Sequence, residues 1–224
     1  TPLNQYDSLV RPLTRWLVEH GVRLRTTTRV ERLEFTAGDT PACVTAICVT
    51  EGSNRQRIAT GEDDLVVTTL GSITAGSAFG SLHAAPRLPS DPEAGAWALW
   101  RNIAARSPRF GRPEVFCGDV PRSTWYSFTV TLRDPAFFAF MERFTGNRAG
   151  TGGLVTFRDS RWLLSIVLPF QPHFAEQPGD AWVFWGYALR ADRAGDRVPK
   201  PIAECNGAEI LAELATHLPL DGPA

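Results

Sequence analysis

Two short stretches of this chain carry polar side chains that a regular helix or strand does not need. SIVLPFQPHF, Ser165 to Phe174, begins as an apolar strand and ends in Gln-Pro-His, and NQYD, Asn4 to Asp7, precedes a helical pattern. A protonated imidazole such as that of His173 offers an anion two N–H groups and a charge, and an amide such as that of Gln5 offers two donors and an acceptor. The alternatives are a histidine satisfied by backbone at the end of a strand and a glutamine bonded to the start of a helix.

The cysteines show no pattern of metal binding or disulfide pairing. No CxxC pair occurs, and no histidine stands at ligand spacing from any of them. The four are Cys43, Cys48, Cys117 and Cys205. We therefore expect small, buried, apolar side chains in a reducing compartment, and no metal site.

Composition restricts the class of protein. With 224 residues, 43% of them hydrophobic, the chain can bury a substantial core in one large domain or two small ones. Its 23 Lys and Arg balance 24 Asp and Glu, giving a net charge of -1, so no electrostatic argument favours nucleic acid or an anionic membrane. We expect no nucleic-acid partner.

The apolar runs fall short of the roughly 20 residues that a membrane span requires, and no signal-peptide pattern is present. A soluble, cytoplasmic protein is expected. The chain opens on Thr1 and ends in LPLDGPA directly after a helical pattern. We expect it to be a fragment, so that any motif before Thr1 or after Ala224 is invisible.

The first third predicts a helix followed by a β-meander. Apolar residues repeat on one helical face from Asp7 to His20, with Asp7 or Ser8 as the cap, Gly21 as the stop, and a late start or kink at Pro12. The period then changes to that of strands in VRLRT, TRVERLEF, CVTAICVT and RQRIAT, which turn-rich stretches separate.

A different kind of strand is predicted next. EDDLVVTTLGS contains a short apolar-and-Thr run, Leu65 to Leu70, which ends at Gly71 and Ser72. A buried strand leading to a glycine brings backbone close to a cofactor in α/β proteins. The order of elements is typical of a dinucleotide-binding flavoprotein domain, although the GxGxxG turn is not in this sequence, and plain α/β scaffolding is the alternative.

The remaining two thirds alternate helices and strands after a long loop at 75–95. Helices are predicted at WALWRNIAARS, PAFFAFMERFTG and AEILAELATHL. Strands are predicted at STWYSFTVTLRD and AWVFWGYAL, with a hairpin at Leu154–Arg158 and Trp162–Leu168 that turns at Asp159-Ser160. The many aromatic residues of this part are expected to face a cavity.

Together these segments resemble one family over nearly the whole chain, from Thr1 to Leu218. The matching runs stand in order and at compatible spacing: NQYDSLVRPLTRWLVEHGV, EDDLVVTTLGSIT, WALWRNIAARSPRFGRPEVFCGD, TWYSFTVTLRDPAFF, GTGGLVTF, SIVLPFQPHF, VFWGYAL and KPIAECNGAEILAELATHL. They are similar to the oleate hydratase family, also called myosin-cross-reactive antigen.

The resemblance implies an FAD-dependent hydro-lyase that adds water to the cis double bond of an unsaturated fatty acid, giving a hydroxy fatty acid with no net redox change. It implies a two-dinucleotide-binding-domain flavoprotein fold of mixed α/β class, here incomplete. Residues 1–85 would belong to the FAD-binding domain, with the meander, and residues 86–224 to a mixed-sheet substrate domain. Peripheral membrane contact for substrate uptake and a homodimer are the candidate assemblies.

Hydration needs an acid to protonate an alkene carbon and a base to direct water at the developing cation. In the family these roles fall to a Tyr and a Glu upstream of the NQY motif. We therefore expect no catalytic acid or base within this chain, and Tyr6 does not take that role.

The resemblance also implies binding roles for individual residues. Gln5 matches a position that lines the substrate channel, and His173 matches a histidine that helps to seat the fatty-acid carboxylate. Val30 lies in a strand that contacts adenine through main-chain groups, and Gly71 and Ser72 match the turn that approaches the flavin. For these last three residues, the alternative is that they are ordinary strand ends.

The chain departs from the family pattern at three positions. Val167 and Pro169 stand where some members have Thr and Asn, so neither offers a side-chain donor to a carboxylate. Leu70 stands where Asn often precedes the glycine, and a side-chain amide contact is lost there. Two other functions remain open: a redox flavoenzyme of the same fold, such as an amine-oxidase-like protein, and a non-catalytic lipid- or flavin-binding protein.

Overall fold

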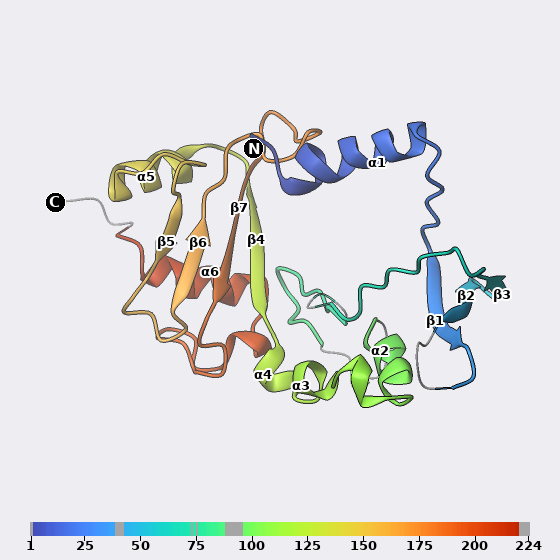
Figure 1. The fold of residues 1–224 in the computed structure, drawn as a ribbon. Coiled ribbons are helices and arrows are strands. Elements are labelled where there is room, and N and C mark those ends of the chain that lie inside the picture. Colours follow the sequence, from blue (N-terminus) through green and yellow to red (C-terminus); the bar gives the residue numbers. More distant parts are fainter. Residues whose placement is uncertain (1, 39–42, 73, 75, 88–95, 220–224) are drawn as a thin grey trace. The chain divides into compact units, whose positions relative to one another are not determined.

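The computed structural model describes residues 2–38, 43–72, 74, 76–87 and 96–219 (Figure 1). The chain divides into two compact units. One contains Thr1–Val22, Phe79–Arg87 and Trp125–Ala224, and the other contains Arg23–Ala78 and Leu88–Thr124. The expected division into a cofactor domain and a substrate domain at residue 85 is a functional one and stays a prediction.

The larger unit is built on a four-stranded sheet in the order β4-β7-β6-β5. The strands are β4 (Tyr126–Leu132), β5 (Leu154–Thr156), β6 (Leu164–Val167) and β7 (Trp182–Ala188). Every pairing within it is antiparallel, so the expectation of a mixed sheet is wrong. For β5 and β6 the reason is the short connection, because a hairpin can join only antiparallel neighbours.

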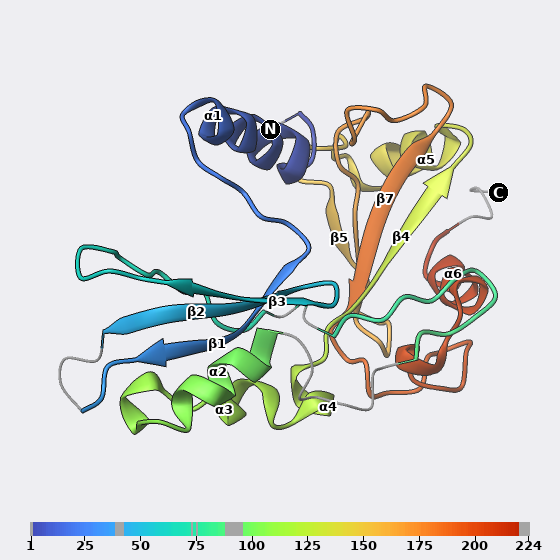
Figure 2. The same cartoon turned by 90° about the vertical axis from the view of Figure 1, so that its right-hand side faces the viewer.

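Two helices pack with this sheet, α5 (Ala136–Thr145) and α6 (Gly207–Thr216), and a short 3₁₀ turn, η3 (Ile202–Glu204), precedes α6 (Figure 2). Their apolar faces close a core with the inward side chains of β6 and β7. The core includes Phe138 and Met141 of α5, Leu214 of α6, Ile166 and Phe184. These elements agree with the sequence-based prediction, including Pro135 at the start of α5.

The amino-terminal helix belongs to the same unit. A π turn, η1 (Tyr6–Val10), runs directly into α1 (Arg11–Glu19), so the helix begins before Asp7 and does not start late. The Arg11 N–H binds the Tyr6 carbonyl in the wider π pattern, and Pro12 follows within the first turn of α1. The wider turn loosens the hydrogen-bond ladder where proline supplies no donor, so the helix continues through it.

The smaller unit contains the predicted meander. Its antiparallel strands are β1 (Thr28–Phe35), β2 (Val44–Glu51) and β3 (Asn54–Ala59), in that order. Helix α2 (Ala96–Ala104) packs on β1, where Leu33, Leu99 and Ile103 form a buried cluster. Short turns follow at η2 (Pro108–Phe110), α3 (Glu114–Cys117) and α4 (Val120–Ser123).

Two predicted strands of this unit are absent. VRLRT, residues 22–26, is not a strand, and neither is the run from Leu65 to Leu70. Leu65 is 87% exposed and Val67 82% exposed, whereas a buried strand was expected. A buried strand requires neighbours that bond its backbone and cover its faces, and no described strand pairs with this run.

The cysteines differ from the uniform burial that the sequence predicts. Cys117 and Cys205 are buried, Cys48 is half-buried and Cys43 is exposed. Burial raises the pKa of the Cys205 thiol to about 11, which makes it unreactive at neutral pH. In the described part of the chain, no helix has both the length and the apolar character needed to cross a membrane.

Candidate functional site

The two stretches NQYD and QPHF are hydrogen-bonded to each other. The carbonyl oxygen of His173 accepts from the backbone N–H of Asn4 at 2.8 Å and from its side-chain amide at 3.0 Å. Asp7 Oδ2 accepts from the Ala175 N–H at 2.9 Å and from Asn4 Nδ2 at 2.7 Å. The start of the helix is therefore fixed to the loop that follows β6, across about three quarters of the sequence.

Asn4 also caps the helix. Its Oδ1 accepts from the Asp7 N–H at 3.0 Å, which is the bond that an N-cap side chain makes. The sequence predicted Asp7 or Ser8 as the cap. This prediction is wrong, because the helix begins about one turn earlier. The Asp7 carboxylate bonds instead to the QPHF loop, and the Ser8 hydroxyl donates to the Leu3 carbonyl.

Two glutamines hold the backbone around His173. Gln177 Oε1 accepts from the N–H groups of His173 at 2.8 Å and Phe174 at 3.2 Å. Its amide nitrogen donates to Gln171 Oε1 at 2.8 Å, and Gln171 in turn bonds both backbone groups of Val183 on β7. This paired amide network replaces the strand ladder after β6 ends, so the loop has a defined path.

The imidazole of His173 is half-buried, and in the described residues neither ring nitrogen has a hydrogen-bond partner. Its ring contacts that of Phe174 edge-on, with centroids 4.9 Å apart. Desolvation lowers the pKa of His173 below its ordinary value, and the negative charge of Asp7 partly opposes that shift. The backbone of this residue is satisfied and its side chain remains available.

Three charged side chains surround the junction. Hydrogen bonds from Ala175 and Asn4, with a smaller contribution from Arg11, lower the pKa of Asp7, so this carboxylate stays ionised. Arg11 lies 3.5 Å from Asp7 and 3.4 Å from Glu176, and it is partly exposed. The site therefore has one ionised carboxylate, which lies close to Arg11, and one half-buried imidazole near it.

Gln5 is exposed, and its side chain makes no capping bond. The alternative reading, a glutamine bonded to the helix start, is therefore wrong, because Asn4 performs that function. The channel role of Gln5 stays a prediction. Val167 is half-buried at the end of β6, and the Pro169 carbonyl accepts from the Gln171 amide at 3.2 Å.

The residues expected to contact a cofactor lie in the smaller unit. Val30 on β1 pairs with Val49 and packs against the cluster around Leu33 and Leu99. A bulge follows directly between Val30 and Arg32. Bulges redirect the backbone and leave one residue out of the ladder, and β1 has no second neighbour among the described strands.

Gly71 lies in a conformation that favours glycine, with φ of +77°. A Cβ at this position would lie 2.3 Å from the Trp97 ring, so the ring packs directly on its backbone. Ser72 forms a local turn by bonding the Thr74 hydroxyl at 2.8 Å. Leu70 packs on the same apolar cluster as Val30, which gives it a packing role in place of an amide contact.

Sequence reasoning missed three residues that build these sites. Asn4 could have been found, because Asn followed three residues later by Asp resembles a helix cap. Gln177 gave no signal, because its partners are fixed only when the loop closes. Trp97 was predicted only on the apolar face of a helix, and its contact with Gly71 is fixed only when α2 packs on β1.

The fold and these sites define a mixed α/β protein with two antiparallel sheets, one carrying a helix-to-loop junction with a free imidazole. The family model for the MCRA family matches residues 1–223, and the chain belongs to that family. It is 39% identical over 96% of its length to an oleate hydratase of Streptococcus pyogenes serotype M49 (strain NZ131). It is 30% identical over 97% of its length to a linoleate hydratase of Lactiplantibacillus plantarum. The chain spans 37% and 40% of those two relatives.

Proposed function

We propose that the complete protein hydrates unsaturated fatty acids and depends on FAD, and that this chain supplies part of its headgroup and flavin sites. The names of the two relatives support the reaction class. The observation that carries the proposal is the junction of Asn4 with His173, which fixes the histidine by its backbone and leaves its ring free. An anionic headgroup is the ligand that such an imidazole suits.

Hydration adds a proton to one alkene carbon and the oxygen of water to the other, and a base takes the surplus proton from that water. No electrons are gained or lost. The acid and base are expected upstream of Thr1. The part of this chain would be to fix the carboxylate end of the substrate, which determines the double bond that reaches the acid.

The smaller unit fits a flavin nucleotide in two respects. β1 has an edge beside Val30 that pairs with no other described strand, and Gly71 has no side chain, so its backbone can be approached closely, as it is on one side by the Trp97 ring. A glycine turn of this kind suits a bulky planar cofactor. Because hydration transfers no electrons, the flavin would supply shape and charge at the site.

A cytoplasmic location, a homodimer and peripheral membrane contact for substrate uptake belong to the same proposal. The second candidate is a redox flavoenzyme, which the same turn at Gly71 would also suit.

Isotope labelling of the product tests the function. We expect the complete protein, incubated with oleate in H₂¹⁸O, to give a hydroxy acid that carries one ¹⁸O, without any electron donor or acceptor. A product that forms only when an electron acceptor is present would identify a redox enzyme. Bound fatty acid without any product would identify a binding protein.

A further inference from the structure

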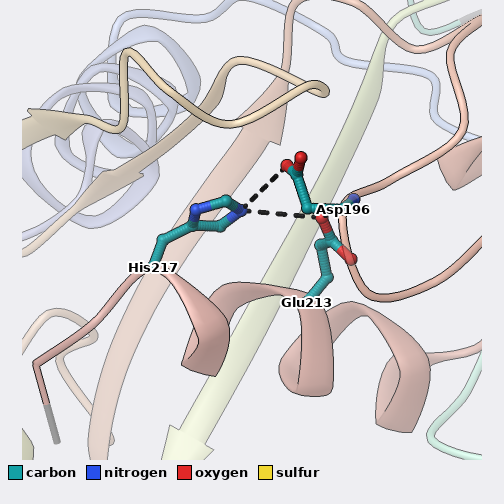
Figure 3. Close-up of side chains that lie close together, drawn as sticks. All are labelled: Asp196, Glu213 and His217. Carbon is teal, nitrogen blue, oxygen red and sulfur yellow. Dashed lines mark hydrogen bonds and ion pairs between the residues drawn. The ribbon is translucent and has the colours of Figure 1, made fainter.

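A second group of polar side chains meets within the larger unit, away from QPHF in sequence. Glu213 lies on α6, His217 follows it by one helical turn, and Asp196 lies in the loop after β7 (Figure 3). His217 Nε2 is 3.5 Å from Asp196 Oδ2 and 3.5 Å from Glu213 Oε1. One nitrogen and two carboxylate oxygens, all within 4.8 Å of one another, converge on one point.

Glu213 is held rigidly although it is fully buried. Its carboxylate accepts three backbone N–H bonds, from Asp196 at 2.6 Å, Arg197 at 2.9 Å and Val198 at 2.9 Å. The loop fits tightly around it, because a Cβ on Gly195 would lie 2.7 Å from the carboxylate carbon. This preorganisation keeps an oxygen in place for a ligand without further ordering.

The group lacks a compensating positive charge. Among the described residues, the ion pairs of Asp196 and Glu213 are both with His217, which carries a charge only when protonated. The three backbone N–H bonds stabilise an ionised Glu213, but they supply no full positive charge to balance two neighbouring carboxylates. A cation at the meeting point of the three side chains would supply that charge.

Unsatisfied atoms give an independent indication. In the part of the chain that the structure describes, two buried side-chain atoms lack a hydrogen-bond partner, His217 Nε2 and Ser160 Oγ. The His217 side chain is only 12% exposed, and Nε2 faces both carboxylates (Figure 3). Ser160 belongs to the adjoining turn, in which Arg161 donates its N–H to Asp196 at 2.9 Å.

The distances suit a metal ion better than a hydrogen bond. Nitrogen and oxygen atoms 3.5 Å apart are too far for a good N–H···O bond. Two ligands of a tetrahedral ion, each about 2.1 Å from the metal, lie about 3.4 Å apart. Both distances from the imidazole match the edge of such a tetrahedron, whereas the two carboxylate oxygens, within 4.8 Å of each other, would close further on the bound ion.

We propose that Asp196, Glu213 and His217 bind one divalent first-row transition metal ion with the coordination chemistry of Zn²⁺. A neutral imidazole and two carboxylates are ligands that this ion accepts. The ion would tie the carboxyl end of α6 to the loop after β7. The inference is independent of the hydratase proposal.

The test uses the complete protein, without a histidine tag, stripped with a chelator and dialysed. Titration with Co²⁺, followed by visible absorption, should show one equivalent bound with the intense bands of a four-coordinate site. Zn²⁺ should displace it and raise the thermal midpoint, because a ligand that binds only the folded state stabilises it.

His217→Gln should lower the affinity for Co²⁺ at least about tenfold, whereas the exposed His83→Gln should leave it unchanged. Asp196→Asn keeps the shape of the loop, and it is the variant to test if His217→Gln does not fold. Stoichiometric binding that is lost in either folded variant supports the site. Absence of tight Co²⁺ binding to the stripped wild type, or unchanged affinity in folded Asp196→Asn, overturns it.

Discussion

His173 is anchored entirely through its main chain. Asn4 binds its carbonyl oxygen and Gln177 binds its N–H, while the imidazole stays half-buried with no hydrogen-bond partner among the described residues. Because Val167 and Pro169 offer no side-chain donors, the ring is the principal donor in this stretch.

We expect His173→Ala in the complete protein to raise KM for a free fatty acid about tenfold or more, because one bond to a charged group is lost. The KM for the methyl ester of the same acid should rise much less, since the ester has no charge for the histidine to bind. Steady-state kinetics on both substrates measure this, with His83→Ala as the control. Equal losses for acid and ester would show that the histidine is structural.

The lowered pKa of His173 predicts a proton linked to binding. Desolvation lowers the pKa of His173 below its ordinary value of 6.5, so the free ring stays neutral to a lower pH. A bound carboxylate would raise the pKa again. At a pH between the pKa of the free ring and the pKa of the ring with bound carboxylate, binding takes up a proton. The affinity for the carboxylate therefore falls as pH rises through that window.

Calorimetry in buffers of different ionisation enthalpy counts this proton. We expect uptake of up to about one proton with the free acid, and none with the ester or with His173→Ala. Uptake that persists in the variant would assign the proton to another group.

At the scale of elements, two close contacts decide how the candidate sites are held. The start of the helix from Tyr6 to Glu19 is fixed to the loop after β6 by the bonds of Asn4 to the His173 carbonyl, and helix α2 is fixed over the glycine turn by Trp97. Both contacts join segments that are distant in sequence. Each therefore couples the position of a site to the packing of a helix.

Gly71→Ala should destabilise the protein by about 1–2 kcal/mol from its positive φ alone, and by more because the methyl group meets Trp97. Gly52→Ala is the matched control, because Gly52 also has positive φ, +59°, but faces open space. Denaturant unfolding and FAD content measure the two effects. Similar losses of stability in both variants would contradict the packing argument.

At the scale of the whole molecule, large apolar side chains are exposed in both units. Leu9, Leu13 and Trp16 on the first helix of the larger unit are each more than half exposed, and Leu65 of the smaller unit is 87% exposed. Isolated apolar residues are common on protein surfaces, but contiguous sets usually mark contact with further protein or with ligand. The relatives are more than twice as long as the part that this chain matches.

The isolated 224-residue chain should therefore fold poorly and should not hydrate oleate. Binding of an apolar dye, size-exclusion chromatography and product analysis measure the two outcomes, with the complete protein as the control. Turnover by the isolated chain would show that the acid and base lie within it.

The sequence by itself determined the longer helices, three of the four predicted meander strands, the hairpin and the family. Apolar periodicity and turn residues are local signals, and family resemblance needs only the order of segments. Local pattern failed at Leu65 to Leu70, because an apolar run becomes a strand only when neighbouring strands bond its backbone. The bond between Asn4 and His173, 169 residues apart, was likewise decided by the tertiary structure. The same holds for the meeting of Asp196 with Glu213 and His217, because a loop and a helix end come together only when the core closes.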